Sequence, residues 1–327
     1  MIPCRVVDDY PRTLLEFEDR FRTEQACRSY LVLLRWPSGF QCRVCGGGQS
    51  WQMRRRGVLV CRACRVHVSI TAGTIFQDSH LPLRVWFRAM WWVTNQKSGV
   101  SAVGLQRALG LGSYETAWSC LHKLRRAMVR PGREPLTEAV EVDEVFVGGV
   151  EPGKGKRHLG ETKALVAGAA EVRGHGTGRI RLQRIPDASG PSLVGFVQGA
   201  VAPGAVVITD GWTAYPGLVD HGYRHRPRVV SRSGQTASAL LPRVHQVASL
   251  LKRWLLGIHQ GRVSHAHLDD YLNEFTFRFN RRLSRHRGKL FYRLLQQAVA
   301  VQPVPYTQLV RRHRSPAGHT SLVASSG

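Results

Sequence analysis

Two pairs of cysteines constrain the fold of this chain more than any other feature of its sequence. Cys42 and Cys45 form one Cys-x-x-Cys pair, and Cys61 and Cys64 form the other, with fifteen residues between the pairs. Each pair can lie in a tight turn that directs two thiolates at one ion, and two such turns complete a tetrahedral site. The spacing predicts a zinc ribbon over residues 37–72 with these cysteines as Zn²⁺ ligands. An iron–sulfur site is the alternative, because it uses the same soft thiolate ligands.

The segments on both sides of the predicted ribbon have helical patterns. Residues 1–36 place apolar side chains at helical spacing, which predicts N-terminal helices. Residues 80–130 read as a helix-turn-helix-like DNA-binding region, with the turn at "GLGS". On its second helix we expect Lys123, Arg125 and Arg126 to contact DNA. A helical hairpin within a bundle is the alternative for this region.

The charge balance indicates an anionic partner. The 327 residues include 47 Lys and Arg against 22 Asp and Glu, a formal net charge of +25. Only seven of these cations are Lys, and the planar guanidinium group of Arg binds phosphate through two hydrogen bonds. We therefore expect a polyanion as the partner. Codon bias in a GC-rich genome also raises the Arg content, but it does not explain the shortage of acids.

The sequence contains no targeting signal of the usual kinds. It has no run of 18 apolar residues, and its first residues lack the apolar core of a signal peptide. We therefore expect no membrane partner and a cytoplasmic protein.

From about residue 139 the pattern changes to that of a mixed α/β domain. Three strands, a helix, a fourth strand and long terminal helices are expected over residues 139–300, and the tail at 303–327 has the composition of a disordered segment. Asp143 lies inside the first strand and Asp210 at the end of the fourth. If those strands are neighbours, the two carboxylates repel unless a cation such as Mg²⁺ lies between them. The alternative is a surface Asp143 and an Asp210 that only forms a turn.

Four blocks of the sequence resemble a known family. These are "EVDEVFVGG", "VVITDGWTAY", "SLLKRWLLGIHQG" and "YLNEFTFRFNRR", which follow the cysteine pairs in consistent order and spacing. Over about residues 10 to 300 the chain resembles a bacterial insertion-sequence transposase that joins a zinc ribbon to a ribonuclease-H-like catalytic domain of the DDE type. The resemblance implies that Asp143 and Asp210 are the first two carboxylates that bind the catalytic metal ions.

The third catalytic position departs from the pattern of that family. It is usually an acid on a helix, eight residues before the arginine of a Lys-Arg pair, and counting back from Arg253 gives His245. His245 shares a polar helix face with Lys252, beside an apolar stripe, so His245 is expected in the active centre and Lys252 and Arg253 at phosphates. A neutral imidazole can bind a divalent ion and favours Mn²⁺ over Mg²⁺. Glu274 is the carboxylate alternative for the third ligand, although its surroundings suit a buried ion pair equally well.

Together these features predict a DNA transposase. The ribbon and the helix-turn-helix-like region would bind the terminal inverted repeats, while Mg²⁺ or Mn²⁺ in the second domain would support phosphodiester cleavage and strand transfer. The resemblance also implies a homo-oligomer that pairs two DNA ends in the bacterial nucleoid. Two alternatives stay open: a DNA-binding protein without catalysis, to which the histidine at position 245 points, and a metal-dependent nuclease that does not join strands.

Overall fold

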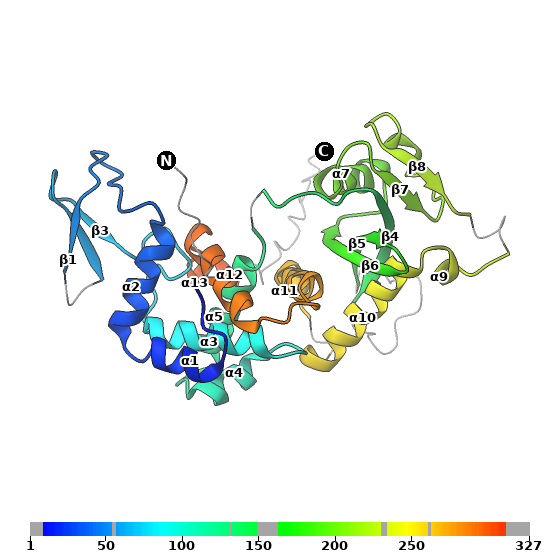
Figure 1. Ribbon diagram of the computed structural model, residues 1–327. Helices are drawn as coiled ribbons and strands as arrows, with labels where there is room; N and C mark the ends of the chain where they lie inside the picture. Colours follow the sequence, from blue (N-terminus) through cyan, green and yellow to red (C-terminus); the bar gives the residue numbers. More distant parts are fainter. Residues whose placement is uncertain are drawn as a thin grey trace, which may run out of the picture.

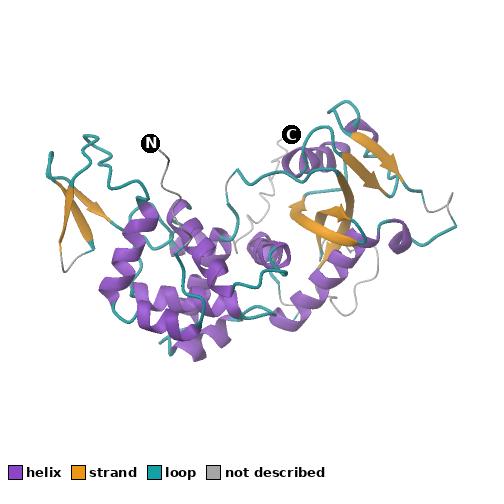
Figure 2. Cartoon of the chain, in the orientation of Figure 1, coloured by secondary structure: helices purple, strands orange, loops and turns teal. Residues whose placement is uncertain are grey.

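The molecule comprises a small ribbon, a helical bundle and a five-stranded sheet with its own helices (Figure 1; Figure 2). Among the described helices, none combines the length and the apolar character needed to cross a membrane. The computed structural model describes residues 9–53, 57–130, 132–148, 163–229, 234–260 and 263–311.

The ribbon is an antiparallel sheet of three short strands. They are β1 (Ser50–Met53), β2 (Val58–Cys61) and β3 (His67–Ser69), with β2 in the centre. Strand β2 ends at Cys61, so the second cysteine pair begins where the strand stops. The backbone then turns at once, because the N–H of Arg65 donates to the carbonyl of Cys61.

The bundle is built from helices of both ends of the described chain. Four of its N-terminal helices begin at a Thr or Ser whose side chain accepts a hydrogen bond from the first turn, at Thr13, Thr23, Ser101 and Ser113. The bundle helices are α1 (Leu14–Arg20), α2 (Glu24–Arg35), α3 (Leu83–Asn95), α4 (Ala102–Leu109), α5 (Tyr114–Ala127) and α12 (Arg287–Ala300).

Aromatic rings fill the core of the bundle. Phe17 of α1 stacks on Trp91 of α3 at 4.7 Å between ring centroids, and Phe291 of α12 meets Phe17 edge-on at 5.3 Å. All three are buried, so residues that lie more than 270 positions apart in the sequence share one core.

The C-terminal segment corrects one expectation. The prediction of a disordered tail from residue 303 is wrong for its first residues, because Tyr306–Arg311 form helix α13 and Leu309 is fully buried. A single apolar anchor in a polar stretch is too weak a pattern to predict. The remainder of the tail, 312–327, lies outside the described residues.

The second domain has the mixed α/β architecture expected from the sequence. Its strands lie in the order β6-β5-β4-β7-β8, with β4 antiparallel to β5 and parallel to β7. The first and fourth strands of the domain are therefore neighbours. The strands are β4 (Ala139–Val147), β5 (Ala164–Arg173), β6 (Gly176–Ile185), β7 (Val206–Thr209) and β8 (Arg224–Pro227).

Helices cover both faces of this sheet. On one face α7 (Gly190–Ala200) packs on residues such as Val142 and Val207, and on the other α10 (Pro242–His259) packs on residues such as Val147 and Ile208. The remaining elements are α11 (Leu268–Asn280), the short α9 (Ala237–Leu240) and two 3-10 turns, η2 (Pro216–Leu218) and η3 (His265–His267).

Helix α11 joins the bundle to the sheet domain. Its Phe277 belongs to the core of the bundle, whereas Phe275 and Phe279 belong to the core between the sheet and α10. It therefore packs against α5 on one side and β6 on the other (Figure 1).

Candidate active site

A buried carboxylate on β4 anchors the start of helix α10. Glu141 is fully buried and accepts hydrogen bonds from the backbone N–H groups of Arg243 at 2.7 Å and Val244 at 3.1 Å. The guanidinium group of Arg243 also lies 3.2 Å from Glu141. The N-cap residue Leu241 offers no side-chain acceptor, so Glu141 satisfies two of the free N–H groups at this helix end and interacts favourably with its dipole.

This anchor places His245 beside Asp143. Asp143 follows Glu141 by two residues, on the same face of β4, and His245 follows the anchored Val244 on α10. Atom Nε2 of His245 lies 3.3 Å from Oδ2 of Asp143. The two side chains are 30% and 19% exposed, so solvent can reach both. The structure thus brings together two of the three catalytic residues expected from the sequence.

Close packing of α10 on the sheet depends on a glycine opposite Asp143. Gly168 of β5 pairs with Asp143 in the strand register. A Cβ atom at position 168 would lie 3.4 Å from Cγ2 of Val244 and 3.3 Å from a methyl group of Leu182. The absence of a side chain there lets α10 approach the strand that carries Asp143.

Asp210 enters the site from the neighbouring strand. It directly follows β7, and its Oδ1 accepts a hydrogen bond from the backbone N–H of Trp212 at 3.0 Å. Gly211 between them has φ +87°, a conformation that favours glycine, and a Cβ there would lie 2.7 Å from Val229. The turn therefore fixes the direction of the Asp210 carboxylate at the end of the strand.

Asp210 lies near enough to Asp143 for its charge to affect the Asp143 carboxylate. Burial and the nearby charge of Asp210 raise the pKa of Asp143 to about 6, against the opposing effect of a backbone hydrogen bond at Glu144. Two carboxylates that disfavour each other's ionisation are stabilised by a divalent cation between them. Asp143 and His245 are in contact, and Asp210 lies near enough for its charge to act on Asp143, so these three residues are the candidate ligands of such an ion.

Glu144 lies on the opposite face of β4. Its carboxylate accepts a hydrogen bond of 2.7 Å from the hydroxyl of Tyr215, which is fully buried in the core beneath α7. Burial raises the pKa of Glu144. Alternation along the strand therefore directs Asp143 towards α10 and its neighbour towards α7.

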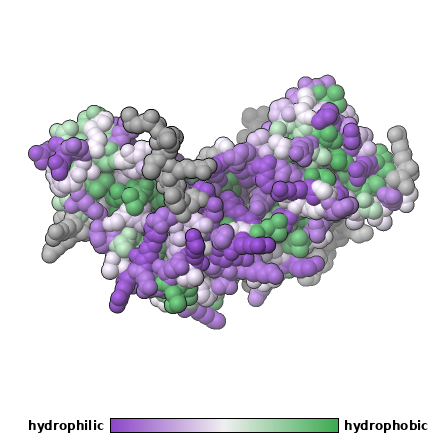
Figure 3. All heavy atoms as spheres, viewed as in Figure 1, coloured by the Kyte–Doolittle hydropathy of each residue, from purple (hydrophilic) through white to green (hydrophobic). Residues whose placement is uncertain are grey.

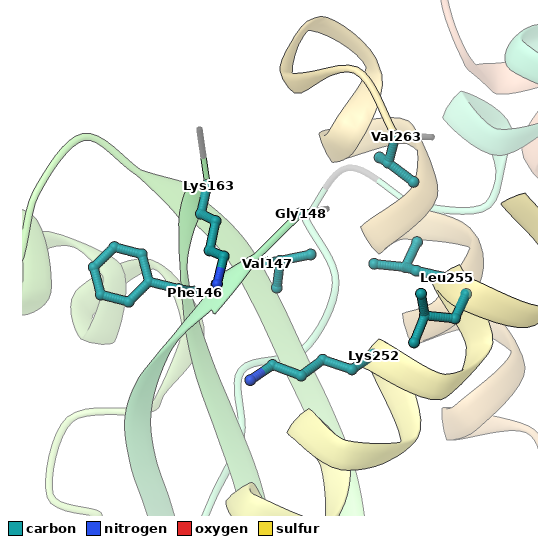
Figure 4. A pocket seen from close by; sticks show the side chains of 8 residues that line it. Phe146, Val147, Gly148, Lys163, Lys252, Leu255 and Val263 are labelled. Atoms are coloured by element: carbon teal, nitrogen blue, oxygen red, sulfur yellow. The ribbon is translucent and has the colours of Figure 1, made fainter. Parts of the chain in front are cut away.

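Lysine side chains lie beyond the carboxylates at the end of β4. An open pocket of about 160 Å³ is lined there by Phe146, Val147 and Leu255 together with Lys163 and Lys252. Figure 4 shows Lys252 reaching from α10 towards the end of β4, where Lys163 also lies. Lys252 and the following Arg253 are exposed, so the two phosphate contacts expected from the sequence are accessible.

The structure contradicts the DNA contacts expected on α5. Arg125 is 2% exposed and its Nε lies 2.8 Å from Glu274, while Nε of Arg126 lies 3.2 Å from Asp270. Lys123 is also buried, and it lines a pocket on another side of α5 together with Asp78 and Tyr306. Arg125 and Arg126 face α11 inside the molecule, as the bundle alternative for this region requires. Their partners lie some 145 residues further along the chain, so no local pattern could reveal them.

Glu274 forms a structural ion pair rather than part of the carboxylate site. It is 1% exposed and accepts hydrogen bonds from Arg125 and from Arg278, the latter at 2.7 Å and 2.9 Å. Although burial raises the pKa of Glu274, the charges of Arg278 and Arg125 lower it to about 2. The Glu274 carboxylate, which is the alternative to His245 as third ligand, is thus already paired with two guanidinium groups.

The four cysteines of the ribbon converge as their spacing predicts. Their sulfur atoms all lie within 4.8 Å of one another, with 3.7 Å between Cys42 and Cys64 and 3.6 Å between Cys45 and Cys61. These separations are too long for a disulfide. A tetrahedral zinc site with bonds of about 2.3 Å has sulfur–sulfur edges of about 3.8 Å, so the cluster fits Zn²⁺.

A second group of possible metal ligands lies at the contact between α5 and α11. His122, His267 and Asp270 are buried and lie within 4.8 Å of one another. However, a guanidinium nitrogen of Arg125 lies 3.4 Å from His122, and Arg126 forms an ion pair with Asp270. Two adjacent positive charges disfavour a cation, and the group is better described as part of the charged packing interface.

Comparison with known proteins identifies the class of protein that carries these sites. Residues 22–67 match the transposase zinc-ribbon domain, and residues 135–280 match the ISXO2-like transposase domain. Both matched segments of the chain are therefore similar to transposase domains. In chain order they combine a transposase zinc ribbon with an ISXO2-like transposase domain of the DDE type.

One relative extends over most of the chain. The chain is 26% identical over 290 residues to a protein of Halobacterium salinarum described as an uncharacterized protein in transposable element ISH50. The alignment covers 82% of this chain and 94% of that protein. No solved structure matches the chain.

Proposed function

We propose that this chain is a DNA transposase that cleaves a phosphodiester bond at each end of its element and joins the freed 3′-OH to target DNA. The observation that supports this most is the contact between His245 and Asp143, with Asp210 at the end of the strand that runs parallel to β4 and near enough for its charge to act on Asp143. The reaction needs no covalent protein–DNA intermediate, so no serine or tyrosine nucleophile is assigned.

These three residues would hold Mg²⁺ or Mn²⁺. The ions would supply activation of the attacking oxygen and stabilisation of the leaving oxygen. The half-buried setting of Asp143 and His245 limits competition from bulk water, and the imidazole favours Mn²⁺. Lys252 and Arg253 would hold a phosphate of the DNA next to the site. Cys42, Cys45, Cys61 and Cys64 would hold a structural Zn²⁺.

The chain would act on double-stranded DNA as a homo-oligomer, because both ends of an element must be held together. A second candidate function is DNA binding without catalysis. The observation that favours it is the histidine at position 245, where an acid is usual in the family.

The test is an assay with the ends of the element, a supercoiled target plasmid and either Mg²⁺ or Mn²⁺. We expect cleaved ends and joined products, both lost in Asp143→Asn and Asp210→Asn while binding of the ends is retained. Cleavage without joined products would instead identify a nuclease. Binding without cleavage in either metal would favour the second candidate.

A further inference from the structure

A large groove lies between the bundle and the sheet domain, on the side of the edge strand β6. Its volume is about 760 Å³, and it is open to solvent. The end of α5 and the chain that follows it, the first half of β6, the end of α11 and helix α12 all contribute to its lining. On the face drawn in Figure 3, hydrophilic residues predominate where the two parts meet. In the sheet, β5 and β4 separate this edge from β7, which leads into Asp210.

Cationic side chains dominate the lining of the groove. Among the described residues, Glu134 is the only carboxylate in the lining, and it pairs with Arg130; a second carboxylate nearby, Glu171, pairs with Arg179. In the described part of the chain, nine cations of the lining thus stand against two carboxylates. The nine cations of the lining are Arg130, Arg133, Arg173, Arg179, Arg181, Arg281, Arg282, Lys289 and Arg293.

Arg181 is buried in this groove without a carboxylate partner in the described chain. It is 5% exposed, and its guanidinium group donates to the backbone carbonyls of Ile180 at 2.9 Å and Glu134 at 2.6 Å. These bonds engage both terminal nitrogens of the guanidinium group but do not neutralise its charge. Burial and the charges of Arg133 and Arg179 lower its pKa to about 10.

Arg281 on the other wall of the groove is partly buried and likewise has no carboxylate partner among the described residues. Its guanidinium group lies 4.1 Å from the centre of the Phe277 ring and donates to the carbonyl of Phe277 at 3.4 Å. Burial and the charges of Arg293 and Arg130 lower its pKa to about 10. Cationic side chains of β6, of the end of α11 and of α12 thus face one groove. Their mutual repulsion lowers folding stability unless an anion binds there.

We propose that this groove binds the phosphate backbone of double-stranded DNA, as a contact separate from the carboxylate site. Guanidinium groups match phosphate oxygens in charge and geometry, and backbone contacts hold DNA without reading its sequence. A second copy of the chain is a poor occupant, because its own net charge is +25. The identification of the polyanion as DNA rests on the proposed function. The groove adds the place where that DNA binds.

The test compares charge-removing and charge-keeping variants in equilibrium DNA binding. Arg281→Gln/Arg293→Gln removes two charges from the groove, and Arg281→Lys/Arg293→Lys keeps both. The matched control is Arg12→Gln/Arg22→Gln, at exposed positions beside α1 that do not line the groove. Binding of linear duplex DNA is measured by fluorescence anisotropy between low and physiological salt.

We expect the Gln pair to reduce the slope of log K against log salt by about 2, because each lost phosphate contact contributes about 0.9. The Lys pair and the control should keep the slope of the parent. The melting temperature of the Gln pair without DNA should equal or exceed that of the parent, because repulsion is relieved.

An unchanged slope in the Gln pair would overturn the proposal. So would a loss of poly-glutamate binding in the Gln pair with DNA binding unchanged, which would assign the groove to an acidic peptide. The test needs no catalysis. If the parent neither cleaves nor joins DNA but the slope falls as expected, the groove stands and only the catalytic proposal fails.

Discussion

Atom Nε2 of His245 on helix α10 lies 3.3 Å from Oδ2 of Asp143 on strand β4. A second contact fixes this geometry. Glu141, which lies two residues before Asp143 on the same face of β4, binds the backbone at the start of α10. The resemblance described above leads us to expect an acid at position 245, and such an acid would lie beside the same carboxylate. The geometry therefore supports the proposal that His245 takes the position of that acid.

Removing the imidazole should impair cleavage without impairing DNA binding. We expect His245→Ala to lower the rate of end cleavage by about 100-fold or more, as for loss of a group that stabilises the transition state. His245→Glu should stay active and shift its preference from Mn²⁺ towards Mg²⁺, because it restores a hard oxygen ligand. The measurement is cleavage of labelled ends in each metal, and a His245→Ala variant as active as the parent would refute the assignment.

Glu274→Gln serves as the contrasting variant. It leaves Arg125 and Arg278 buried with one negative charge fewer, so we expect a loss of folding stability of about 3 kcal/mol or more. Unfolding in urea measures this loss. A stable Glu274→Gln protein that has lost only cleavage would instead make Glu274 the third ligand.

The anchor of α10 should matter for catalysis through the position of His245. Glu141→Gln removes the charge that binds Arg243 and the N–H groups of the helix start, and we expect a destabilisation of about 1–3 kcal/mol with slower cleavage. End binding should stay near that of the parent. Glu138→Gln, an exposed carboxylate just before the same strand, is the control and should leave both quantities unchanged.

The ribbon should hold one Zn²⁺ per chain. The four sulfur atoms already lie at tetrahedral separations, so elemental analysis of freshly purified protein should give near one zinc. The double variant Cys42→Ala/Cys45→Ala should lose it. Iron in place of zinc would support the alternative iron–sulfur site.

Acid should weaken the contact between α5 and α11. Burial lowers the pKa of His122 to about 4, although a hydrogen bond with Asp270 opposes this shift. The folded state therefore favours neutral His122, and its contribution is present above pH 6.5 and is lost as the pH falls towards 4. The loss reaches about 3 kcal/mol at pH 4 for a shift of this size. Urea unfolding at several pH values measures it.

The substitution His122→Gln removes the titrating group and keeps an amide that can donate to Asp270. Its unfolding free energy should fall less than that of the parent between pH 6.5 and 4. Equal slopes in the two proteins would show that His122 does not titrate in this range.

The sequence predicts those parts of the molecule that depend on local spacing. The ribbon follows from two short cysteine motifs, and the strands next to Asp143 and Asp210 follow from their apolar patterns, whereas the adjacency of the two strands is known only from the structure. His245 was found by counting residues from a family motif. Each of these signals lies within a few residues of the feature it predicts.

Other parts depend on partners far away in the sequence. The basic residues of α5 have the same local pattern whether they face DNA or the acids of α11, and only the tertiary structure distinguishes the two. The role of Glu141 is hidden for the same reason, because its partner Arg243 lies 102 residues later. In the sequence, Glu141 is visible only as an acid two residues before Asp143, on the strand face that an alternating pattern assigns to both.

Helix α11 is packed into two cores, and this fixes a distance within the molecule. Phe277 is held in the bundle while Phe275 and Phe279 are held under the sheet, so a hinge at this helix would have to open two cores at once. The separation between the bundle and the carboxylates of the candidate site is therefore fixed by the packing of α11 rather than by a flexible linker. If the chain cleaves DNA as proposed, the cut should therefore fall at a constant number of base pairs from the duplex segment that is bound in the groove.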